Sequence, residues 1–224
     1  MSKPAENRPS DLRNIVAAIL VVVVASSCGH DPGRITFEYL GKVALVRDQI
    51  EKEDRANIPK IIRNRDYAEF GRAVIRIKAY NEALSNIPKE GVDWEAVMYT
   101  DNLKSYLDPL AKLCSDTAGL LESIDKARQM DLPKYVAVPD IESALSTANG
   151  DTLDLVDAIL TAIGPRNAWR FGAQDPLQPY QMQTGIDLIG ASGIKKHIED
   201  RTGKIQDDLQ QRYPKFNWTP RGFL

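Results

Sequence analysis

Few side chains in this sequence could do chemistry, and its cysteines and histidines are the first candidates. The chain contains two cysteines, Cys28 and Cys114, and two histidines, His30 and His197. Two cysteines allow at most one disulfide within the chain and cannot assemble a cysteine-based zinc site. Two histidines leave little material for histidine-dependent catalysis. Cys28 follows the small residues that end an aliphatic segment, so its thiol is the candidate for covalent modification.

The sequence lacks the spaced motifs of the common enzyme classes. It contains no Gly-x-Ser-x-Gly, Walker, Gly-x-Gly-x-x-Gly or His-Glu-x-x-His pattern. A di-metal helical bundle requires Glu-x-x-His pairs, and Ile194 stands three residues before His197. The segment GASG at 190–193 has no phosphate-loop lysine and predicts an interruption of a helix. We therefore expect no cofactor and no metal, while a carboxylate pair hidden among the 31 acidic residues keeps a hydrolase-type enzyme open as an alternative.

Composition places the chain among ordinary globular proteins. Its 224 residues are 43% hydrophobic and 27% charged, with a formal net charge of −2. This length suits one domain with a substantial core. Because the charge balance is nearly neutral, we expect no nucleic-acid partner.

The amino terminus has the pattern of an export signal. Lys3, Arg8 and Arg13 precede an apolar core of eleven residues, 15–25. A membrane-spanning helix needs about 20 apolar residues, so this core is too short to span a bilayer. A basic lead, a short apolar core and small residues before a break indicate a secretory signal.

The end of that signal resembles a known sequence family. The residues VASSC at 24–28 are similar to the lipobox of bacterial lipoproteins. The resemblance implies cleavage before Cys28 and acylation of its thiol with palmitate-type chains, so that 1–27 is a signal peptide and 28–34 a tether. Two alternatives stay open: cleavage by the ordinary signal peptidase after Ala25-Ser26-Ser27, and retention as a short uncleaved anchor.

The location follows from the same resemblance. An acylated Cys28 holds the protein on a membrane of the cell envelope, facing the periplasm or the exterior. Gly29 follows the cysteine, where an Asp would resemble the inner-membrane retention signal. In a bacterium with two membranes we therefore expect the outer membrane.

The remainder, 35–224, is expected to form a single all-α domain. Apolar residues recur at spacings of three and four over 35–55, 67–84 and 93–130, which favours a helical bundle with long, antiparallel, coiled-coil-like helices. Asn57 with Pro59, or Asp66 with Glu69, is expected to begin the second helix. Pro109 should bend or break the third.

The second half of the domain contains shorter predicted elements. The segment 130–140 is expected to be a break, followed by a short helix over 141–149. Asp151 should cap another helix that stops at Gly164-Pro165. Helix should return from Ile186 or Ile194 to Tyr213.

Two irregular stretches are candidate surfaces for a protein partner or a membrane interface, and the alternative that their aromatic side chains only pin irregular chain onto the bundle stays open. The segment 164–185 has no helical period and is predicted to be a long loop, and the tail after Tyr213 also lacks periodicity. Aromatic and arginine side chains are enriched in protein interfaces. The candidate partner-binding residues in these stretches are Trp169, Arg170, Phe171, Tyr180, Phe216 and Trp218.

Cys114 lies within an apolar stripe, so we expect it to be a buried core residue rather than a reactive thiol. His197 lies at the edge of a helical face and is expected to be solvated. The sequence thus predicts a lipid-anchored cell-envelope protein that binds or scaffolds an envelope protein or peptide. An envelope enzyme and a phage- or plasmid-type exclusion factor are the alternatives.

Overall fold

The computed structural model describes residues 32–129, 138–171 and 178–215, and these residues form an all-α fold without a strand. The all-α prediction is confirmed. Cys28, Phe216 and Trp218 lie outside the described residues.

The elements follow one another closely along the chain. A first rod consists of α2 (Pro32–Lys52), a π-helical turn η1 (Glu53–Asn57) and α3 (Ile58–Asn64) in direct succession. It is followed by α4 (Tyr67–Ser85), α5 (Trp94–Gln129), α6 (Val138–Thr147), α7 (Thr152–Phe171) and α8 (Gln178–Arg212).

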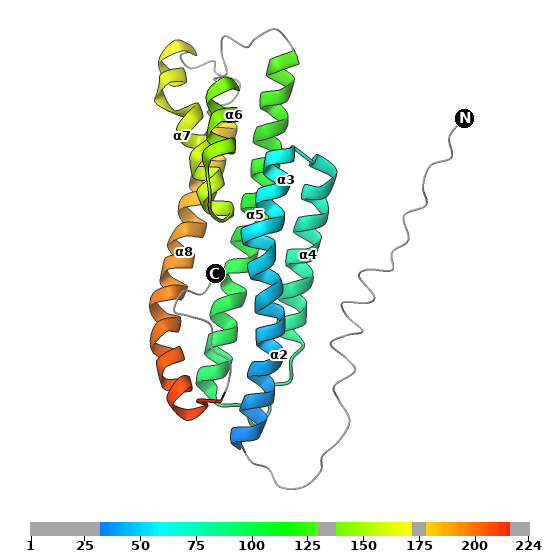
Figure 1. Cartoon of the computed structure of the whole chain (residues 1–224), viewed down its shortest axis with the longest axis vertical. Helices are drawn as coiled ribbons and strands as arrows, with labels where there is room; N and C mark the ends of the chain where they lie inside the picture. Colours follow the sequence, from blue (N-terminus) through cyan, green and yellow to red (C-terminus); the bar gives the residue numbers. More distant parts are fainter. Residues whose placement is uncertain (1–31, 130–137, 172–177, 216–224) are drawn as a thin grey trace, which may run out of the picture.

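The long helices lie side by side as a bundle. Figure 1 shows α2, α4, α5 and α8 running along the same axis in alternating directions, with α6 and α7 covering the upper part. The starts of α2 and α5 and the end of α8 meet at one end of this bundle. The predicted helical bundle is therefore present, and its packing is compatible with the long, antiparallel, coiled-coil-like helices expected.

The core is built by the heptad stripe of α5, which faces the other helices. Seven stripe positions are completely buried: Leu103, Leu107, Leu110, Cys114, Thr117, Leu121 and Ile124. Burial of such apolar side chains is the main stabilising contribution, at about 25 cal/mol per Å². The expectation that Cys114 is a core residue is confirmed.

Helix ends are specified by local chemistry at the α3–α4 junction. Arg65 has a φ of 52° and closes α3 in the left-handed conformation, with its N–H bonded to the carbonyls of Ile61 and Ile62. The Asp66 carboxylate then accepts the N–H of Glu69 at 3.1 Å and caps α4. Both helix starts considered in the sequence exist, because Pro59 lies in the first turn of α3.

Two predicted interruptions are wrong, and of the bend or break expected at Pro109 the break is absent. The helix stop at Gly164-Pro165 is absent, since α7 continues to Phe171, and much of the predicted loop 164–185 is helical. The interruption at 190–193 is absent because α8 passes through it, and α5 is not broken at Pro109. A proline inside a helix removes one backbone hydrogen bond, and a glycine lowers helix stability by about 1 kcal/mol relative to alanine. Packing along a helix of 35 or 36 residues outweighs either effect.

Candidate partner-binding face

Charged side chains converge at the π-helical turn, where they are shielded from solvent. Glu53 and Asp54 begin η1, and both are 0% exposed. A π-helical turn widens the helix and displaces side chains from the regular register, and such turns are frequent at functional sites.

Asp54 lies in a cluster that links four elements. Lys195 of α8 donates to Asp54 Oδ2 at 3.4 Å and to the carboxylate of Asp151, which precedes α7. The Tyr106 hydroxyl of α5 donates to Asp54 Oδ2 at 3.5 Å, and the Thr152 hydroxyl donates to the Asp54 carbonyl at 2.9 Å. Asp54 Oδ1 has no hydrogen-bond partner among the described residues.

Burial controls the protonation of this cluster. Burial raises the pKa of Asp54, and the neighbouring Asp151 raises it further, while Lys195 opposes the increase. Burial alone would lower the pKa of Lys195, but the carboxylates of Asp54 and Asp151 raise it above the ordinary lysine value. Lys195 therefore remains an ammonium shared by two carboxylates.

Glu53 belongs to a second network on the other side of the turn. The Arg76 guanidinium of α4 donates to both Glu53 oxygens, with Nη2 at 2.7 Å from Oε1, and Asn57 donates at 2.9 Å. Arg76 also contacts Glu69 at 2.6 Å. Burial opposes ionisation of Glu69, but Arg76 and Arg72 hold its pKa below the ordinary value.

The two networks fix the register between helices. Glu53 joins the first rod to α4, and Asp54 joins it to α5, α7 and α8. Because both carboxylates are completely buried, a substrate cannot reach them in this conformation. The arrangement suits structural ion pairs better than general acid–base catalysis, which requires contact with the reacting group. Sequence reasoning missed these residues because their pattern does not differ from that of surface charges.

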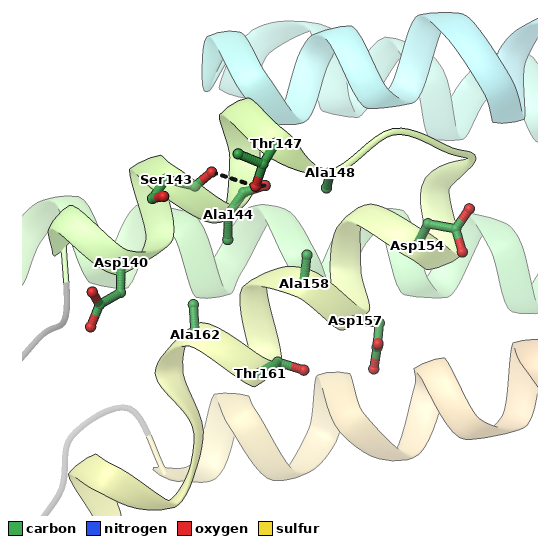
Figure 2. Close-up of a pocket in the computed structure, with 10 residues that line it drawn as sticks. All are labelled: Asp140, Ser143, Ala144, Thr147, Ala148, Asp154, Asp157, Ala158, Thr161 and Ala162. Carbon is green, nitrogen blue, oxygen red and sulfur yellow. Dashed lines mark hydrogen bonds between the residues drawn. The ribbon is translucent and has the colours of Figure 1, made fainter.

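A groove runs between α6 and α7. Figure 2 shows alanines facing one another across it: Ala144 from α6 and Ala148 just after α6, and Ala158 and Ala162 from α7. The groove has a volume of about 840 Å³ and is bordered by Asp140, Asp154 and Asp157. The groove exists because small side chains line it, and carboxylates lie along its border. The residues that line it do not bring reactive groups together.

The outer face of α8 carries the most prominent exposed apolar surface in the described residues. Met182, Ile186 and Ile189 are 62%, 57% and 73% exposed. Their spacing of four and three places them on one face of the helix. Thr184 and Ala191, which point into the bundle, are buried. We call Met182, Ile186 and Ile189 the α8 outer stripe.

Three glycines lie next to the α8 outer stripe, and packing inside the bundle does not require them. A Cβ added at Gly185, Gly190 or Gly193 would meet no atom within 4 Å. Each glycine costs about 1 kcal/mol relative to alanine in a helix interior. Small residues on an exposed face allow another backbone to approach closely, so this combination suits a helix docking along α8.

The size of the stripe defines the kind of contact it can make. Residues 182–193 extend for about 17 Å of helix. The three side chains expose on the order of 300 Å², which is typical of functional patches on monomers. A stable interface needs about 800 Å² per partner, so the stripe alone is too small for a permanent dimer of this chain. It suits a transient contact or part of a larger one.

The predicted site residues have different outcomes. The structure describes the helical backbone at Trp169, Arg170, Phe171 and Tyr180 but not their side chains. Their proposed role in partner binding stays a prediction, as it does for the tail residues outside the described part. His197 is exposed on α8, as expected. The stripe could have been found in the sequence from its four-and-three spacing had 178–193 been assigned to a helix.

No helix in the described residues combines the length and the apolar character needed to cross a membrane. No family model, curated protein or solved structure matches this chain.

Proposed function

We propose that the protein is a lipid-anchored scaffold of the bacterial cell envelope that binds a partner protein through the α8 outer stripe. The anchor is Cys28, which the VASSC sequence supports as an acylation site. The partner is a protein that lays a helix along α8.

The α8 outer stripe is the observation that carries this proposal. Met182, Ile186 and Ile189 remain in water in the folded chain, although burying an isoleucine side chain contributes about 1.5–3 kcal/mol. A partner helix would gain that contribution, and Gly190 leaves room for its backbone. The buried carboxylates at η1 do not favour the alternative of an envelope enzyme.

Site-specific crosslinking in intact cells tests the partner. A photoreactive side chain at position 189 should form a discrete adduct, and Ile186→Asp should abolish it. The matched control is the same probe at position 75, because Ile75 is an exposed residue of α4, outside the stripe. Equal adducts at both positions, or an adduct at 189 that survives Ile186→Asp, would contradict the proposed face.

Cell fractionation tests the anchor. Cys28→Ala should abolish fatty-acid labelling and remove the protein from its membrane. Cys114→Ala is the matched control, because Cys114 is completely buried and should leave labelling unchanged. Labelling that persists in Cys28→Ala would refute lipidation at this cysteine.

A further inference from the structure

One end of the bundle carries an exposed aromatic side chain beside the start of the described chain. Trp94 is the first residue of α5 and is 65% exposed. The N–H of its neighbour Asp93 donates to Thr36 Oγ1 of α2 at 3.0 Å. Trp94 therefore lies within about one helical turn of the beginning of α2.

The length of chain before α2 restricts where this end can be. Four residue steps separate Cys28 from Pro32, and a fully extended chain covers at most about 14 Å in that distance. An acylated Cys28 lies at the membrane surface, so the start of α2 and the adjacent start of α5 are held close to the headgroups. The opposite end of α5 lies about 50 Å away along the helix.

From this placement we propose that the bundle end formed by the starts of α2 and α5 and the end of α8 contacts the lipid surface, with Trp94 at headgroup level. This inference rests on the proposed lipidation of Cys28 and goes further, because it assigns a second membrane contact to the folded domain. Tryptophan is enriched at membrane interfaces, where its ring is apolar and its N–H finds a polar partner.

The charges next to Trp94 are compatible with such a contact. Trp94 lies between Asp93 and Glu95, two acids that would resist approach to lipid phosphates. Arg212 at the end of α8 pairs with both, at 3.1 Å to Asp93 and 3.0 Å to Glu95. The ion pairs reduce this repulsion, so the tryptophan ring can approach the headgroups.

Basic residues at the same end are also paired. Arg34 lies 3.7 Å from Glu38, and Lys89 lies 3.0 Å from Asp101. Attraction to anionic lipid is therefore not the main contribution, and the occupant we assign is a lipid surface that need not carry net charge. Phosphatidylcholine vesicles are accordingly a sufficient probe.

Quenching of tryptophan fluorescence by brominated lipid tests the proposal. The chain has three tryptophans, and the double variant Trp169→Phe/Trp218→Phe leaves Trp94 alone. The full chain, extracted from membranes with its lipid, is reconstituted into phosphatidylcholine vesicles with and without brominated acyl chains. We expect about a twofold loss of Trp94 emission, because a ring at headgroup level lies next to the upper part of the brominated acyl chains.

The matched control moves the tryptophan to the far end of the same helix. Adding Trp94→Phe and Glu122→Trp to the double variant places the probe about 42 Å further along α5, at an exposed position. Its emission should not respond to brominated lipid. If the double variant loses its helical circular dichroism, the wild type is compared with Trp94→Phe instead. The difference in quenching between these two proteins then gives the contribution of Trp94.

The outcomes separate this inference from the proposed function. Intact mass of the same sample reports whether Cys28 is acylated. An acylated, vesicle-bound protein whose Trp94 is not quenched overturns the membrane contact and leaves the anchor standing. A bare Cys28 overturns the anchor itself, and the inference that depends on it falls with it.

Discussion

Replacement of Lys195 by methionine tests whether the buried cluster holds the bundle in register. The substitution keeps the apolar stem of the side chain and removes the ammonium that Asp54 and Asp151 share. Asp54 is completely buried, and its Oδ1 already lacks a partner among the described residues. Lys195→Met therefore leaves a buried carboxylate facing a second carboxylate.

The expected cost follows from the burial of the two partners. Removing one member of a buried ion pair typically costs about 3–5 kcal/mol. Asp151 keeps part of its hydration, since its side chain is 18% exposed. We therefore expect Lys195→Met to lower the free energy of unfolding by about 3 kcal/mol, the lower end of this range. This would be a large fraction of the stability of an ordinary domain.

The loss should depend on pH. Burial raises the pKa of Asp54 above its unfolded value of about 3.9, so its contribution to stability is present at acidic pH and lost as the pH rises through the folded value. Without Lys195 the folded pKa rises further, because the opposing positive charge is gone. The deficit of Lys195→Met should therefore be smaller at pH 5 than at pH 8.

Denaturant unfolding, followed by circular dichroism at both pH values, measures these differences. The matched control is Lys196→Met, because Lys196 is the adjacent residue and is exposed. It should change stability by less than about 0.5 kcal/mol. Equal effects of the two substitutions, or a Lys195→Met deficit that grows on acidification, would refute the assigned role of the cluster.

Other predictions concern single positions. Cys114→Ala should lower the free energy of unfolding by about 1 kcal/mol in chemical denaturation. The native Cys114 thiol should resist alkylation until the chain unfolds, because burial raises its pKa to about 12. Rapid alkylation of the native chain would contradict its burial. Asp66→Ala should lower the unfolding free energy by about 1 kcal/mol through loss of the α4 cap, whereas an unchanged value would contradict capping. Gly190→Ala should stabilise the chain by about 0.5–1 kcal/mol in the same assay while weakening the crosslink at position 189, and an undiminished crosslink would argue against close helix approach.

Periodic signals predicted α2, α4 and α5, and local capping chemistry predicted the starts of α3, α4 and α7, whereas the start of α8 was not predicted. Asp66 with Glu69 marked the start of α4, and the α5 stripe around Cys114 identified the core. These features are encoded over neighbouring residues, so tertiary contacts are not needed to recognise them.

The helix interruptions were overpredicted because glycine and proline are local signals that tertiary packing can override. Pro165 lies within α7, and Gly190 and Gly193 lie within α8. Assigning 164–185 to a loop also concealed the regular spacing of Met182, Ile186 and Ile189. A spacing of four and three places side chains on one face only when the segment is helical.

The buried cluster was beyond sequence reasoning for a different reason. Asp54 and Lys195 are separated by 141 positions, and each belongs to a segment rich in charged residues. Only the packing of the bundle, which places Lys195 of α8 beside the π-helical turn, brings these two side chains together. A pattern confined to neighbouring residues carries no information about such a pairing.

The intact mass of the protein extracted from its native membrane tests the central claim most directly. We expect residues 28–224 with the added mass of a diacylglyceryl group and an amide-linked acyl chain at Cys28. A chain that retains Met1, or that begins at or before residue 28 with a free thiol at this position, would contradict the lipid anchor and the envelope function proposed from it.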